Sequence, residues 1–160
     1  MKNKNNKNGF TLIELLVVIA IIALLSSVAL IALVSARQKS RNTKRLGDMT
    51  QMNTALELYF TANRGYPSGT NGVPSDLVPQ FVSSVPTAPP PPDGVCEFLT
   101  HSSPVPAGVA ANTYYYVPSG TSQSINGKEV YPGYSYYFCL GQKTGDFEPG
   151  ERILTPSGVK

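Results

Sequence analysis

The stretch GFTLIELLVVIAII, residues 9–22, opens an apolar run that contains a single charged residue, Glu14. From residue 15 to residue 36 the chain has 22 consecutive residues without a charge, and all but three are Leu, Ile, Val or Ala. At about 1.5 Å per residue this run forms about 33 Å of helix, enough to cross a hydrocarbon core of about 30 Å. The sequence therefore predicts a helix that meets a membrane, and the carboxylate of Glu14 needs a partner there.

The helical pattern continues past the apolar run and becomes amphipathic. Its apolar residues recur at steps of three and four and form one stripe: Leu46, Met49, Met52, Leu56, Tyr59 and Phe60. No proline occurs between Phe10 and Gly65, and Gly65 suits the C′ position of a helix that ends there. We therefore predict one helix over about residues 11–63, apolar in residues 10–36 and amphipathic in residues 37–65.

Residues 66–160 predict a globular head rich in β-structure. Strand-forming residues dominate 112–117 (NTYYYV) and 134–140 (YSYYFCL), and Asn126-Gly127 between them is a tight-turn signal. We expect residues 152–155 to add a short third strand. One face of the second strand carries Tyr134, Tyr136, Phe138 and Leu140. That face can cover the helix stripe, so the fold class is α+β: a long helix packed against a small antiparallel sheet.

Cys96 and Cys139 are the two cysteines of the chain. An even number of cysteines in a polar domain attached to a membrane segment favours a disulfide and an extracytoplasmic head. The alternative is two unrelated buried thiols. The charges that flank the apolar run do not decide its orientation, because basic residues precede it and follow it.

The sequence shows no catalytic motif and predicts a protein that is not an enzyme and has no cofactor. His101, the single histidine, lies in a loop rich in Ser and Pro, where we expect a surface side chain. Asp146, Glu148 and Glu151 form the acidic cluster of the head and are a weak calcium candidate. A solvated turn is the preferred interpretation of the three acids, and no metal site is predicted.

The basic run RQKSRNTKR, residues 37–45, follows the apolar segment directly. Five positive charges can attract lipid headgroups or nucleic acid. Their position favours the membrane interface or pairing between subunits, and we do not expect nucleic acid as a partner.

A cleaved secretory signal is an alternative for the N-terminus, since Val34-Ser35-Ala36 would suit signal peptidase. The apolar run is longer than the usual ~7–15 residues, and Glu14 lies inside a segment that should be free of charge. Both features disfavour this interpretation.

The segment KNGFTLIELLVVIAIIALL, residues 7–25, strongly resembles the N-terminus of type IV prepilins and of the related pseudopilins. The resemblance covers about residues 7–36, and ALELYFTANRGYP, residues 55–67, is also similar to that family. One departure concerns a helix-breaking proline that many members carry midway along the apolar segment. This chain has Leu30 and Ile31 there.

The resemblance implies that a prepilin peptidase removes a leader, residues 1–9, by cutting between Gly9 and Phe10, and methylates the new amine of Phe10. It implies a single-pass precursor in the inner membrane with an extracytoplasmic head, which the assembly machinery there builds into a helical filament at the cell surface. Loss of the leader takes Lys2, Lys4 and Lys7 from the thirteen basic residues and leaves ten, equal to the ten acids.

The first hypothesis for function is therefore a pilin, the structural subunit of a type IV pilus. A pseudopilin of a type II secretion system is the alternative, and a membrane-anchored or secreted binding module with a tyrosine-rich face is a third. Two accounts of Glu14 stay open. In one, it forms a capping box with Thr11; in the other, which the resemblance supplies, it pairs with the amine of Phe10 on a neighbouring subunit.

Overall fold

The protein is described from a computed structural model that covers residues 10–160. Its one long helix, α1, runs from Leu12 to Asn63, so the predicted helix over about residues 11–63 is confirmed. By internal contacts the chain forms two compact units that divide after Arg37. The second unit contains the amphipathic half of α1 and all the strands.

Nine strands and one short 3-10 helix follow α1. They are β1 (Tyr66–Pro67), β2 (Gly69–Thr70), β3 (Val73–Pro74), the 3-10 helix η1 (Gly94–Glu97), β4 (Tyr115–Ser119), β5 (Gln123–Ile125), β6 (Lys128–Tyr131), β7 (Gly133–Leu140), β8 (Gly150–Thr155) and β9 (Gly158–Val159). The main sheet is antiparallel, with the order β4-β7-β8-β9. A second sheet has the order β1-β6-β5, and β2 pairs with β3.

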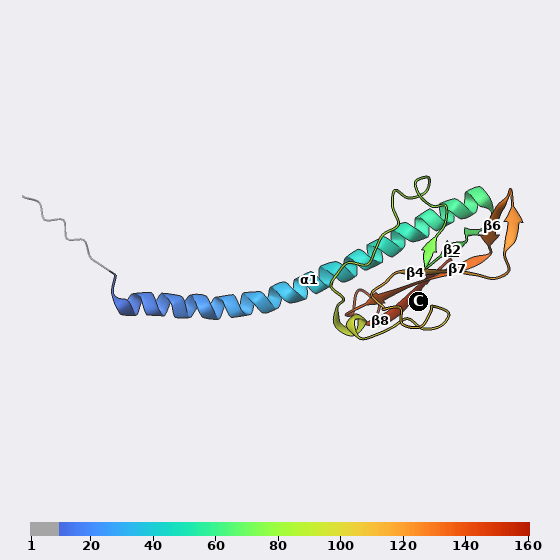
Figure 1. Cartoon of the computed structure of the whole chain (residues 1–160). Helices are drawn as coiled ribbons and strands as arrows, with labels where there is room; N and C mark the ends of the chain where they lie inside the picture. Colours follow the sequence, from blue (N-terminus) through green and yellow to red (C-terminus); the bar gives the residue numbers. More distant parts are fainter. Residues whose placement is uncertain (1–9) are drawn as a thin grey trace, which may run out of the picture. The chain divides into compact units, whose positions relative to one another are not determined.

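The amphipathic half of α1 lies against the main sheet (Figure 1). Met49, Met52, Leu56 and Tyr59 are buried in one cluster with four side chains of β7, namely Tyr134, Tyr136, Phe138 and Leu140. Because side chains alternate along a strand, these four share the face that the sequence predicted would cover the helix. The α+β packing of a long helix on a small antiparallel sheet is therefore confirmed.

Phe60 departs from the predicted stripe because it is exposed, although its ring packs against Tyr66 with centroids 4.9 Å apart. Ala55 is buried in the stripe instead. A helix turns by 100° per residue, so Tyr59 and Phe60 cannot both face one direction.

The turn at Asn126-Gly127 does not join the two strands that the sequence placed on either side of it. Asn126 and Gly127 have φ values of 53° and 76°, and they connect β5 to β6 in a hairpin of their own. Two central residues with positive φ are typical of the tight hairpin turn that Asn-Gly favours. The β5–β6 hairpin and β9 are elements that the sequence analysis missed.

The end of α1 also differs from the expectation. Arg64, not Gly65, adopts the left-handed conformation, with φ of 60°, and its N–H donates to the carbonyl of Phe60 at 2.7 Å. Gly65 is needed for another reason. A Cβ at this position would lie 2.7 Å from Cβ of Val130, so only glycine lets β6 approach.

Candidate functional site: the N-terminal segment and the supports of the head

The apolar half of α1 has no cover within the described part of its unit. Sixteen Leu, Ile and Val side chains between residues 12 and 34 are each between 45% and 81% exposed. The helix is long and apolar enough to cross a membrane. Because patches of this size are not left in water, the segment must lie in lipid or against other protein chains.

Thr11 and Glu14 form a capping box at the start of α1. The backbone N–H and the hydroxyl of Thr11 donate to Glu14 Oε2 at 2.8 and 2.7 Å, and the N–H of Glu14 approaches the Thr11 hydroxyl oxygen at 3.3 Å. The two contacts with the carboxylate use one oxygen, so Oε1 makes no bond to Thr11. The capping box that the sequence suggested for Glu14 is therefore present in the structure. Because it uses only Oε2, the carboxylate can still accept a hydrogen bond from a second partner. Gly9 and the leader lie outside the described residues.

The structure joins Cys96 and Cys139 in a disulfide, with Cα atoms 5.8 Å apart. Both cysteines are buried, with Ala111, in a small cluster separate from the main core. Cys139 follows Phe138 on β7 and therefore points to the sheet face opposite α1. The bond fastens the segment that contains η1 to this outer face.

A buried ionic cluster lies between α1 and the same segment. The guanidinium of Arg45 is fully buried and donates to Asn42 Oδ1 at 2.8 Å, Asp93 Oδ2 at 3.1 Å and Asn112 Oδ1 at 2.6 Å. Arg41 also binds the Asp93 carboxylate, with Nε at 2.8 Å from Oδ2. These two arginines hold the head together, which corrects the assignment of the whole basic run to the membrane interface or to neighbouring subunits.

Burial and hydrogen bonding act in opposite directions on Asp93. Removal of the carboxylate from water favours its neutral form, but the guanidinium groups of Arg41 and Arg45 outweigh that effect, so the pKa of Asp93 is lowered.

The backbone next to Asp93 is also closely packed. Gly94 has φ of 50°, and a Cβ on it would collide with the carbonyl oxygen of Gly141.

The position of Arg45 could have been found in the sequence. Asn42 and Arg45 continue the buried stripe towards the N-terminus at the same steps of three and four that separate Met49 and Met52. A charged residue in phase with a core stripe predicts a buried, paired charge.

His101 is buried, so the expected surface position is wrong. Its Nδ1 lies 2.8 Å from Glu151 Oε2 and its Nε2 lies 2.6 Å from the carbonyl oxygen of Thr113. The N–H of Ser102 also donates to Glu151 at 2.9 Å. Burial opposes ionisation of Glu151, but the bonds from Ser102 and His101 prevail and lower its pKa. The long-range bridge from the loop to β8 has no local sequence signal.

The three acids of the calcium candidate are not brought together as ligands. Glu151 is bound by His101 and Ser102, and Glu148 pairs with Lys143. Within residues 10–160, no three His, Cys, Asp or Glu side chains are grouped in a way that could hold a metal ion.

Residues 4–30 match the family described as the prokaryotic N-terminal methylation motif. Neither a curated protein nor a solved structure matches the chain. The motif is the signature of type IV pilins and pseudopilins, so this chain carries that signature on a pilin-like α+β fold. The motif supports a pilin-like or pseudopilin precursor, and proteins of that class are generally structural. The motif implies processing by prepilin peptidase and filament assembly in general, and with the apolar helix it fits a membrane-anchored precursor.

Proposed function

We infer that this protein is the pilin of a type IV pilus, a structural subunit polymerised into a helical surface filament. The observation that carries the proposal is the uncovered apolar half of α1, most of which lies within the methylation motif. No described residue of its own unit covers this surface. Lipid covers it before assembly, and equivalent segments of other subunits cover it afterwards.

In this proposal the chain has four parts with separate tasks. Residues 1–9 are the leader, and prepilin peptidase cuts between Gly9 and Phe10 and methylates Phe10. Residues 10–36 span the inner membrane and then form the filament core. Residues 37–65 continue the helix, and the head of residues 66–160 is extracytoplasmic, in keeping with the disulfide between Cys96 and Cys139.

Glu14 is proposed to pair with the amine of Phe10 on the neighbouring subunit. That amine exists only after cleavage, because Phe10 is an internal residue of the precursor. The capping box supports this role, since it fixes the carboxylate through one oxygen at the N-terminal end of α1. An assembled filament would then neutralise two charges inside an apolar core, where either charge alone is costly.

A pseudopilin of a type II secretion system is the second candidate, because it would share the motif and the apolar helix. Mass spectrometry of filaments sheared from the surface of the native host separates the two. A pilin should be the dominant component, and its N-terminal peptide should begin at methylated Phe10. Absence from long filaments would favour the pseudopilin, whereas an N-terminal peptide that begins at Arg37 would contradict both.

A further inference from the structure

Phe98 is the most exposed large apolar residue of the head, at 81%. It lies directly after η1, and its neighbours Val95 and Leu99 are also exposed. The backbone that carries Phe98 is held in place. The N–H groups of Phe98 and Leu99 both donate to the carbonyl of Val95 at 3.2 Å, and the disulfide holds Cys96 two residues before. Aromatic side chains are enriched among the residues that carry binding energy at interfaces, so Phe98, beside exposed Val95 and Leu99, is a candidate contact site.

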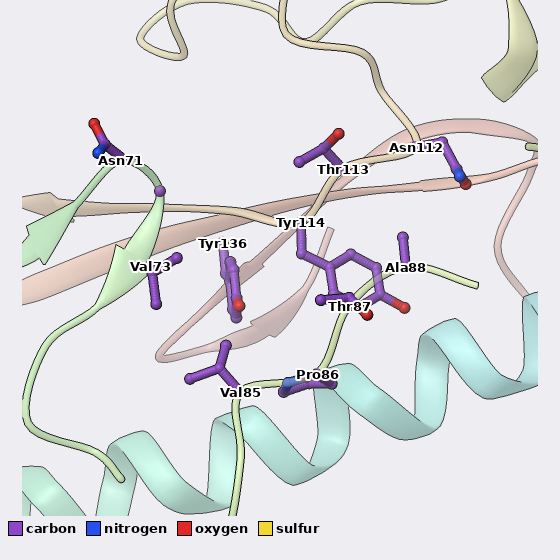
Figure 2. Close-up of a pocket in the computed structure, with 11 residues that line it drawn as sticks. Asn71, Val73, Val85, Pro86, Thr87, Ala88, Asn112, Thr113, Tyr114 and Tyr136 are labelled. Atoms are coloured by element: carbon purple, nitrogen blue, oxygen red, sulfur yellow. The ribbon is translucent and has the colours of Figure 1, made fainter. Parts of the chain in front are cut away.

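A pocket of about 500 Å³ lies elsewhere on the same head. Figure 2 shows Tyr114 and Tyr136 between Val73, which belongs to β3, and the segment that carries Val85 and Pro86. No residue that lines the pocket is charged. Tyr114 is held in place because its hydroxyl donates to Asp48 at 2.8 Å. The pocket is therefore formed before anything binds, and an uncharged apolar group suits it.

The segment that carries Phe98 and the pocket belong to opposite sides of the sheet. Cys139, which anchors the support of Phe98, points away from α1, whereas Tyr136 lies in the core that faces α1. A subunit therefore cannot place its own Phe98 in its own pocket by a small movement. Contact between two copies would use different surfaces on each copy, and a contact of this kind that does not close into a ring produces an open helical polymer.

We propose that Phe98 of one subunit inserts into the pocket formed by Val73, Val85, Tyr114 and Tyr136 of a second copy of the chain. The proposal rests on the proposed function, because it requires subunits that assemble head to tail. The chemistry of the two surfaces supports this assignment. The benzyl group of Phe98 is poorly solvated by water, and the pocket is uncharged and largely apolar, so it would hold that group.

Charges beside the two surfaces suit this contact. Glu97, next to Phe98, is exposed. Lys44 Nζ and Tyr114 Oη bind the same oxygen of Asp48, at 2.9 and 2.8 Å, so a partly exposed lysine lies beside the Tyr114 edge of the pocket. A glutamate that arrives with Phe98 would therefore meet the exposed lysine of the Lys44–Asp48 pair, which can donate to a second carboxylate.

Photocrosslinking in assembled filaments tests the proposal with the full chain. Phe98 is replaced by p-benzoylphenylalanine, which keeps the aromatic ring, and irradiated filaments are digested and mapped. The expected product joins position 98 of one copy to residues 71–73, 85–88 or 112–114 of another. The same label at Val78, a half-exposed head residue outside the pocket, should not give this product. Crosslinks from position 98 to other peptides would overturn the inference.

Paired substitutions test the same contact from both sides. Phe98→Ser and Thr87→Trp, which would fill the pocket, should each reduce recovered filament about tenfold, while Phe98→Tyr should retain it. Membrane-bound precursor with an intact disulfide shows that a variant has folded. Normal filaments from Phe98→Ser and Thr87→Trp would refute the contact and leave the pilin assignment standing. A wild-type strain without this subunit in its filaments would instead refute the proposed function, and the inference with it.

Discussion

The two halves of α1 have the same backbone and opposite surroundings. Leu30, in the first half, is 62% exposed, whereas Leu56, in the second, is fully buried beneath the sheet. The difference in exposure follows from how the apolar side chains are distributed around each half of the helix. The second half has an apolar stripe that one sheet can cover, but the first is apolar all round, and such a helix needs a continuous apolar environment. One half is therefore completed by folding and the other by lipid or by other subunits.

The largest expected effect comes from Glu14→Gln, which tests whether the first half is completed by neighbouring subunits. A glutamine can keep the capping box with Thr11 but cannot neutralise an amine. Cleavage and membrane insertion should be unchanged, while recovered filament should fall by at least an order of magnitude. Immunoblots of membrane and sheared fractions measure both quantities. Normal yield and stability of the variant filaments would mean that Glu14 serves only as a cap.

The next effect concerns the second half, where Arg45→Ala leaves Asp93 buried with one arginine fewer. The free energy of unfolding should fall by about 3 kcal/mol, because Asp93 keeps only Arg41 as an ionic partner, and the side-chain oxygens of Asn42 and Asn112 lose the donor that Arg45 supplies. Urea unfolding in mild detergent, followed by tyrosine fluorescence, measures it. Lys143→Ala is the control, since this lysine pairs with Glu148 and both side chains are exposed, so it should change stability by less than about 1 kcal/mol. Equal effects of the two variants would show that burial of Arg45 is unimportant.

The disulfide gives a third test, confined to the head. The bond between Cys96 and Cys139 has a sequence separation of 43 residues, and by the chain-entropy estimate its loss costs up to about 4 kcal/mol. Cys96→Ser with Cys139→Ser should lower the urea midpoint of the head and leave the helical signal of residues 10–36 in detergent unchanged. Alkylation of both cysteines in protein isolated without reductant would contradict the bond itself.

The sequence predicted the elements that depend on local pattern. The extent of α1 followed from the spacing of Met49, Met52 and Leu56 and from the absence of proline, and the buried face of β7 followed from simple alternation. Apart from the short β5–β6 hairpin and β9, the missed features described above are contacts between residues far apart in the chain. Arg45 meets Asn112 and His101 meets Glu151, and neither pair shares a local period or motif. The N-terminal motif is the part that the sequence alone indicates most readily, because its residues, from Gly9 to Glu14, are contiguous.

A fourth test lowers the pH, which should destabilise the head through its hydrogen-bonded acids. The pKa values of Asp93 and Glu151 are lowered in the folded head. Their contribution is therefore present above the unfolded pKa values, about 4, and is lost as the pH falls below them. The urea midpoint should drop between pH 5 and pH 3, and the drop should be smaller in Asp93→Asn. Glu148→Gln, at an exposed acid, is the control and should follow the wild type.

The smallest effect concerns the end of the buried half of α1. There the left-handed residue is Arg64, whereas the sequence suggested Gly65. Arg64 holds φ of 60°, a conformation that costs a residue with a Cβ about 1 kcal/mol. Arg64→Gly should therefore raise the free energy of unfolding by up to about 1 kcal/mol, less the entropy that glycine gains in the unfolded chain. Gly65→Ala should act in the opposite direction, because the new methyl group would lie 2.7 Å from Cβ of Val130. Urea unfolding of the two variants side by side gives the sign. If Arg64→Gly were destabilising as well as Gly65→Ala, the left-handed residue would be Gly65, and the helix would end as its sequence alone suggests.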